Sequence, residues 1–311
     1  MLYALMLATA IASDGQFEKA TGIRYEHVPC PHGEGSVRKY TKLTGNTMGG
    51  YDSDLARYSS RTQFRTHAIS TCPSSYFSAL GTELDRPIPE VHRSAIDDAI
   101  AQSRSEWADA ENPEVWERYD TAARIAGVLG RDPIDVAELY LAASWTARDA
   151  AVGIYVGGLN GPQAARQILD LGEQELAKDL TPDSRKVLRY NLARVAHRGG
   201  FNADRDRHLS AYAKLSNLTA AEAEAGRRMR HIAKVVEPRY QRAAVMALQA
   251  GIQHRPTGFR SARARYQLAD LHRRLGNRDR AVAVFKQAVA HDDTPADLKE
   301  TARYLLEVLG Q

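Results

Sequence analysis

The chain has 311 residues, of which 43% are hydrophobic and 26% are charged, a composition typical of a globular protein with one large or two ordinary domains. The net charge is only +4, but the positive excess is concentrated, because residues 221–280 hold 14 basic and 5 acidic residues. Composition also excludes an obvious membrane span, since no apolar run reaches the roughly 18–20 residues that a spanning helix requires.

The first residues of the chain predict a signal peptide over residues 1–12. The stretch MLYALMLATAIAS carries no charge, and Ala10-Ile11-Ala12 before Ser13 matches the cleavage pattern of exported proteins. No basic residue precedes the apolar stretch, so a buried first helix is the alternative. Cleavage after Ala12 would place the mature chain in an oxidising compartment.

Residues 13–85 predict a small β-containing, ribbon-like module. Two runs rich in threonine, aromatic and branched residues, at 36–43 and 62–69, are typical of strands and lie between turn signals. Both cysteines of the chain, Cys30 and Cys72, fall in this module, each immediately before a proline. A module of this size buries little core of its own.

Residues 86–311 predict one helix after another. Capping residues precede proline at several points, and one threonine–glutamate pair has the spacing of a capping box. These start signals lie at Asn112, Asp132, Thr181, Thr294 and, for the capping box, Thr219 with Glu222. Apolar residues recur between them at intervals of three and four, which is the helical period.

A tetratricopeptide-type repeat is visible near the C-terminus. Its packing residues are Leu268, Ala269, Gly276, Ala281, Phe285 and Ala288. Small residues let two helices approach closely, Phe285 fills the remaining space, and Gly276 turns the chain between them. Leu192, Ala193 and Gly200 form a weaker copy. The predicted fold class is therefore mainly α: a small ribbon-like N-terminal module followed by a tetratricopeptide-like helical repeat array.

Two blocks of residues carry a family resemblance. They are Cys30-Pro31, residues 50–55, Tyr58-Ser59 and Thr71-Cys72-Pro73 with Tyr76, and then residues 139–145 with Arg148. These blocks resemble a bacterial family known as domain of unknown function 2225. In that family both turns read Cys-Pro-x-Cys, which implies a four-cysteine zinc ribbon ahead of repeat-like helices. This chain departs from it, with Gly33 and Ser75 where the second cysteines would stand.

Three outcomes are open for the two remaining cysteines. Zinc could be retained by Cys30, His32, His67 and Cys72, or both thiols could pack as small apolar groups. Alternatively, cysteines that once shared a metal lie close enough to form a disulfide after its loss. We predict the Cys30–Cys72 disulfide, worth about 4 kcal/mol on a chain-entropy estimate, and no cofactor, with zinc as the alternative.

The sequence contains no recognised catalytic motif. Asp52 and Asp54 are expected to accept hydrogen bonds from the backbone of a turn. Candidate residues for binding an acidic partner lie in the arginine-rich block and are Arg227, Arg230, Lys234, Arg263 and Tyr266. Because nucleic-acid binders usually interleave such residues with aromatics or glycines, a protein or peptide partner is favoured over nucleic acid.

The sequence thus predicts a non-enzymatic protein-binding or scaffold protein of the bacterial periplasm or cell envelope, which uses a helical-repeat groove. One alternative is a cytosolic zinc-binding adaptor that retains metal through Cys30, Cys72 and a histidine. The other alternative is an enzyme of unknown class.

Overall fold

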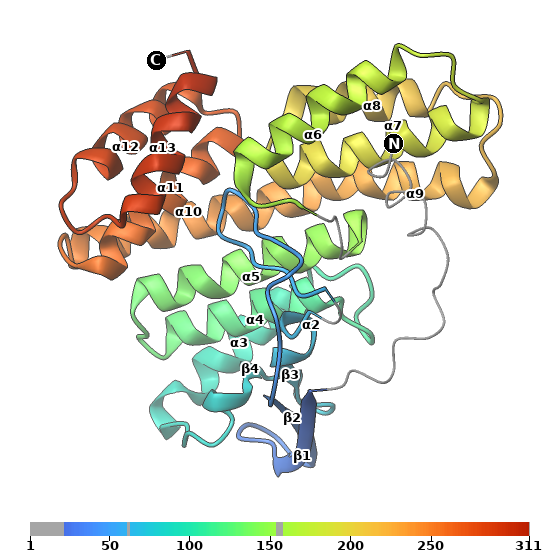
Figure 1. Cartoon of the computed structure of the whole chain (residues 1–311). Helices are drawn as coiled ribbons and strands as arrows, with labels where there is room; N and C mark the ends of the chain where they lie inside the picture. The colour runs from blue at the N-terminus through green and yellow to red at the C-terminus, as the bar shows by residue number, and fades with distance from the viewer. Residues whose placement is uncertain (1–21, 61–62, 154–157, 311) are drawn as a thin grey trace.

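The computed structural model describes residues 22–60, 63–153 and 158–310, so the predicted signal peptide over residues 1–12 lies outside the described residues. The chain is mainly helical, with a small antiparallel strand module near its N-terminal end followed by helices (Figure 1). This agrees with the fold class predicted from the sequence.

The N-terminal part contains short elements. They are β1 (Ile23–Pro29), β2 (Ser36–Lys42), α2 (Arg65–Ala68), β3 (Ile69–Thr71), β4 (Ser78–Leu80), η1 (Gly81–Glu83) and η2 (Glu90–His92). The longer helices follow. They are α3 (Arg93–Arg104), α4 (Val115–Val128), α5 (Pro133–Val152), α6 (Gly161–Leu176), α7 (Pro182–Gly199), α8 (Asn202–Tyr212), α9 (Ala220–His231), η3 (Ile232–Val236, a π-helical segment), α10 (Glu237–His254), α11 (Phe259–Arg274), α12 (Arg278–Ala290) and α13 (Ala296–Val308).

The strands form two antiparallel hairpins, β1 with β2 and β3 with β4. Strand β2 confirms the prediction for residues 36–43. The strand predicted over residues 62–69 is wrong for residues 63–68, whereas Ile69 begins β3 and residue 62 lies outside the described residues. Residues Arg65–Ala68 are helical, because Arg65 is held by the rest of the fold: its guanidinium binds Asp149 and its carbonyl accepts a hydrogen bond from Tyr119. Tertiary contacts therefore override the local strand preference.

The strand module shares its core with the helices beside it. Val37, Cys72 and Phe77 pack with Ile96 of α3 and Ile125 of α4 in one buried cluster. The predicted boundary between residues 85 and 86 therefore runs through a continuous packing unit. This contact supplies the apolar burial that the module lacks by itself.

The helix-start signals are largely confirmed. Asp132 and Thr181 cap α5 and α7 with their side chains, and Thr219 with Glu222 forms a capping box at α9. The start predicted at Asn112 is wrong, because α4 begins at Val115 and the capping box is formed by Glu114 with Glu117. The cap predicted at Thr294 is also wrong, because α13 begins at Ala296 with Pro295 in the capping position.

The C-terminal repeat packs as its sequence pattern predicts. Ala269, Ala281, Phe285 and Ala288 are buried between α11, α12 and α13, whereas Leu268 is buried on the side of α11 that packs against α5 and α10. Gly276 turns the chain between α11 and α12 with a φ of +80°, a left-handed conformation that glycine adopts without strain. Figure 1 shows the two outer groups of helices, α6–α8 and α11–α13, at opposite ends of the rod formed by α9 and α10. Within the described ranges, no helix is long and apolar enough to cross a membrane.

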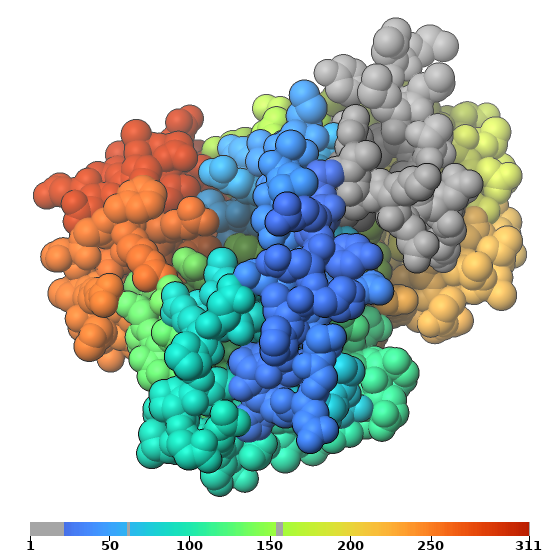
Figure 2. All heavy atoms as spheres, turned by 90° about the horizontal axis from the view of Figure 1, so that it is seen from below, coloured from blue at the N-terminus to red at the C-terminus, as the bar shows by residue number. Residues whose placement is uncertain are grey.

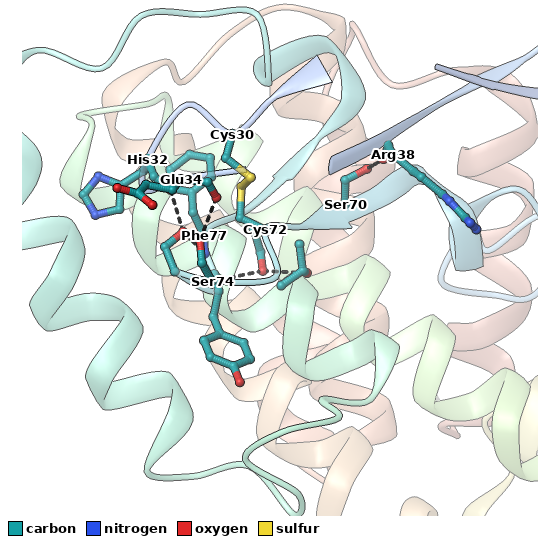
Figure 3. Close-up of a disulfide and its surroundings, with 12 residues drawn as sticks. Cys30, His32, Glu34, Arg38, Ser70, Cys72, Ser74 and Phe77 are labelled. Carbon is teal, nitrogen blue, oxygen red and sulfur yellow. Dashed lines mark hydrogen bonds between the residues drawn. A yellow bond between two sulfur atoms is a disulfide. The ribbon is translucent and has the colours of Figure 1, made fainter. Parts of the chain in front are cut away.

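Cys30 and Cys72 form a disulfide, with their Cα atoms 5.9 Å apart. The two cysteine–proline turns face each other, with Cys30, His32 and Glu34 opposite Cys72 and Ser74 (Figure 3). Ser75 Oγ donates a hydrogen bond of 2.5 Å to the carbonyl of His32. A Cβ atom at Gly33 would lie 2.7 Å from Cβ of Ser75. The four positions 30, 33, 72 and 75 therefore converge, which is the arrangement that the family resemblance implies for a ribbon.

Removing the disulfide should destabilise the chain. The double variant Cys30→Ala with Cys72→Ala is expected to lower the free energy of unfolding by about 4 kcal/mol or less, because the unfolded chain loses a long covalent loop. Equilibrium denaturation with and without reductant measures this change. Alkylation without reductant, followed by intact mass, should add no alkyl group to the wild-type chain.

Reductant should have no effect on the double variant, which serves as its own control. An unchanged denaturation midpoint for the reduced wild-type chain would refute a stabilising role for the bond.

Candidate functional site: an apolar groove beside a buried ionic network

A hairpin-like loop over residues 49–58, here called the acidic loop, enters the middle of the helical array. It is closed by two backbone hydrogen bonds, from the Gly49 amide to the Tyr58 carbonyl and from the Tyr58 amide to the Gly50 carbonyl. A 3.0 Å bond from the Tyr51 amide to the Leu159 carbonyl attaches it to the chain before α6. Gly50 has a φ of +81°, and a Cβ atom there would lie 1.8 Å from the Leu159 oxygen. Only glycine permits this approach. In Figure 1 the loop, drawn in blue, passes between α5 and the outer helices.

Arg148 of α5 is fully buried and binds three carboxylates. Its guanidinium lies 2.7 Å from Asp52, 2.5 Å from Asp54 and 2.5 Å from Glu237. Two of these partners come from the acidic loop and the third begins α10. A buried cation of this kind is stable only when carboxylates surround it at hydrogen-bonding distance.

The network continues from Asp52 and Ser53 to the outer helices. Arg198 of α7 donates to Asp52 at 2.7 Å, while the Ser53 hydroxyl donates to Asp270 and accepts from both Arg273 and Arg274 of α11. The members form a balanced set of four cations and four anions. They are Arg148, Arg198, Arg273 and Arg274 with Asp52, Asp54, Glu237 and Asp270.

The pairing keeps the buried carboxylates ionised. Burial alone would raise the pKa of Asp54, but the charges of Arg148 and Arg274 outweigh burial and hold that pKa below its ordinary value. The pKa of Glu237 is likewise lowered, because Arg148 and His197 outweigh its burial. These groups therefore stabilise the fold as charged pairs.

The expectation for Asp52 and Asp54 needs correction. Asp54 accepts one bond from the turn backbone, from the Ala56 amide at 3.4 Å, but the main partners of both carboxylates are helix arginines far away in sequence. Because the acidic loop fills the space between α5, α7, α10 and α11, these helix faces are closed to a partner.

A separate groove of about 1040 Å³ opens beside this network. Its walls are β4 with the link over residues 83–92, and one face each of α4, α5 and α11. Most of the lining is apolar and includes Ile88, Ile125, Leu139 and Phe259. On the face drawn in Figure 2, α5 (green) lies between the orange C-terminal helices and the blue-green residues that follow the strand module. The groove thus lies where the strand module meets the helical array.

The charges in the groove do not balance. Glu83 binds both Arg86 and Arg131, and Arg260 binds Asp135. Arg263, which is half-buried on α11, has no hydrogen-bond or ionic partner among the residues that the structure describes. The groove therefore offers one uncompensated guanidinium in an apolar setting.

The structure separates the predicted binding residues. Arg227 pairs with Glu224, Lys234 pairs with Asp206, and Arg230 donates to the Leu209 carbonyl, so these three lie around α9 and η3. Arg263 alone lines the groove.

Tyr266 is fully buried and donates a 2.7 Å hydrogen bond to the Ser53 carbonyl. It therefore cannot contact a partner at the surface, which corrects the prediction. The prediction failed because Tyr266 lies on the side of α11 that faces the acidic loop.

The four alternative zinc ligands do not form a metal site in this structure. The two sulfurs are bonded to each other, His32 binds Asp97 at 2.7 Å, and the His67 ring packs on Tyr40 at 5.6 Å between ring centres. Among the described residues, no group of three or more histidine, cysteine, aspartate or glutamate side chains is arranged to hold a metal ion.

No protein-family model, curated protein or solved structure matches this chain. The resemblance to the family of domain of unknown function 2225 therefore rests on the cysteine turns and the residues around them, and it stays a prediction. The functional argument rests on the geometry of the groove.

Neutralising Asp54 should destabilise the fold strongly. The Asp54→Asn substitution keeps the shape of the side chain but removes the charge that faces Arg148 and Arg274. The expected loss is about 3–5 kcal/mol in the free energy of unfolding, since it leaves buried cations without compensation. Equilibrium denaturation measures it.

Asp98→Asn is the matched control, because Asp98 is exposed on α3, and its effect should stay within about 0.5 kcal/mol. Equal effects of the two substitutions would contradict the structural role of the network.

Stability should fall in two stages as the pH is lowered. Burial lowers the pKa of His208 to about 4 from 6.5, so the unfolded chain gains a proton first and stability declines between these values. Below about pH 4, protonation of the unfolded chain also removes the contribution of Asp54 and Glu237, whose folded pKa values are lowered.

Denaturation over a pH series measures both stages, and His208→Asn should weaken the first one. Stability that stays constant down to pH 3 would show that these groups do not titrate in this way.

Proposed function

We propose that this chain is a non-enzymatic protein-binding or scaffold protein of the bacterial cell envelope, and that it holds a segment of its partner in the groove. The groove itself carries the proposal: a volume of about 1040 Å³, mostly apolar walls, and Phe259, 61% exposed, in its lining. Concave apolar sites of this size are where proteins bind ligands, and exposed apolar patches mark interaction sites.

The proposed binding place differs from the one expected from the repeat pattern. The acidic loop occupies the space between α5, α7, α10 and α11, and its contacts there are buried. A partner segment therefore binds where the array meets the strand module, along α4, α5 and α11.

The hydroxyl groups that line the groove favour binding over catalysis. Ser78 is engaged with Thr71 and with the carbonyl of Tyr76, and the Tyr119 hydroxyl donates to the Arg65 carbonyl. A nucleophile would instead be hydrogen-bonded to a base that could take its proton.

The disulfide supports an exported protein. Disulfides persist in oxidising compartments such as the periplasm and are rare in the cytosol. Together with the predicted signal peptide over residues 1–12, the Cys30–Cys72 bond favours the periplasm or cell envelope over the cytosol.

Selection of peptides from a displayed random library, with the full chain as bait, tests the proposal. Individual selected peptides are then measured by fluorescence anisotropy. Ala126→Trp, which fills the groove from α4, should weaken binding by at least about tenfold, or about 1.4 kcal/mol. The matched change Ala250→Trp, at an exposed position of α10 outside the groove, should leave binding unchanged.

Both variants should keep the denaturation midpoint of the wild-type chain. Failure to select any peptide, or peptides that bind the Ala126→Trp variant normally, would overturn the proposed function.

A further inference from the structure

One face of α11 carries a row of side chains that all line the groove. Phe259, Arg263 and Gln267 are spaced four residues apart, so they follow one another along the helix. The C-terminal half of the same helix binds the acidic loop through Asp270 and Arg274, which lie further along the same face. The ionic network therefore anchors the helix at one end, and the row lines the groove from its N-terminal part.

Arg263 supplies the charge that the groove leaves uncompensated. The three carboxylates in the lining, those of Glu83, Asp135 and Glu138, all lie within 4.0 Å of Arg131 or Arg260. A guanidinium offers a planar set of donors that fits a carboxylate with two parallel hydrogen bonds. A ligand that carries a single carboxylate would therefore neutralise the unpaired charge of Arg263 in the groove.

Gln267 supplies a second and independent feature. The residue is only 4% exposed and lines the groove, and its side-chain amide forms no hydrogen bond with the described residues. The amide is therefore available to hydrogen-bond with a ligand in the groove. A side-chain amide presents one acceptor and two donors, which complement the N–H and C=O of a peptide group.

Trp145 adds a donor from α5. The Trp145 residue lines the groove, and its buried indole Nε1–H has no partner within the described part of the chain. The indole can donate only, and therefore suits a carbonyl oxygen. A fatty acid would satisfy Arg263 but has no N–H group for the Gln267 oxygen, so a polypeptide fits the three groups better.

We infer that the groove recognises a peptide through one carboxylate bound by Arg263, with the neighbouring peptide group on Gln267 and a large apolar side chain against the wall formed by residues such as Ile88, Leu139 and Phe259. This inference rests on the proposed function, because it names the partner chemistry of the same groove. The carboxylate belongs to an aspartate or glutamate side chain or to a free C-terminus.

The test uses peptides selected by the wild-type chain from random libraries displayed with free and with blocked C-termini. Enriched peptides should combine a carboxylate with an adjacent aromatic or branched residue. Replacing that carboxylate by an amide, at the side chain or at the C-terminus, identifies its source. The replacement should weaken binding by at least about tenfold, or about 1.4 kcal/mol.

Arg263→Gln should weaken the carboxylate peptide by a similar factor and leave the amide peptide unaffected, so that the two losses are not additive. Arg242→Gln is the matched control, since Arg242 is exposed on α10 outside the groove. Gln267→Leu should weaken both peptides, because it removes the contact to the peptide group.

The outcomes separate this inference from the proposed function. Peptides that depend on the groove, as shown by Ala126→Trp, but not on Arg263 or a carboxylate would overturn the inference and leave the function standing. Peptides indifferent to Ala126→Trp, or no selected peptide, would overturn both. Selection of acidic peptides that bind the Arg263→Gln variant equally well would also overturn the inference.

Discussion

The pairing of buried guanidinium groups with carboxylates is the constraint on which this fold depends. A charged group in a protein interior is tolerated only when opposite charges and hydrogen bonds replace water. Here the helices contribute Arg148, Arg198, Arg273 and Arg274 but only two of the four carboxylates, and the acidic loop contributes the other two, Asp52 and Asp54. The helical array without its N-terminal loop would hold a buried excess of positive charge. The buried charges are therefore balanced only when the N-terminal part and the helices are folded together.

This arrangement gives α11 two distinct roles. The middle and C-terminal turns bind the acidic loop through Tyr266, Asp270 and Arg274, and the N-terminal and middle turns line the groove with Arg263 and Gln267. Because the C-terminal part is fixed by many short contacts, the groove-lining part of the same helix is held in position before any ligand arrives. Preorganised groups lose little conformational entropy on binding, which favours affinity.

Local features of this chain could be predicted from its sequence, whereas long-range ones could not. The strand at 36–42, the caps at Asp132, Thr181 and Thr219, and the packing of Phe285 all follow from patterns within a few residues. The disulfide was also predictable, because the resemblance placed both turns in one ribbon. By contrast, Asp54 binds Arg148, which lies 94 positions away in the sequence, and no local pattern specifies that contact. The groove could not be predicted either, because its walls come from four parts of the chain that are distant in sequence.

The disulfide also limits how far a pulling force can extend the chain. Cys30 and Cys72 are 42 positions apart, and the acidic loop lies wholly between them. A pulling force applied along the backbone can pass directly from one sulfur to the other, so residues 31–71 cannot be extended while the bond is intact. Roughly 14 nm of chain, at up to about 3.4 Å per residue, is hidden from the force in this way. The acidic loop and its contacts with Arg148 therefore lie within a segment that stays closed under tension until a reductant breaks the disulfide.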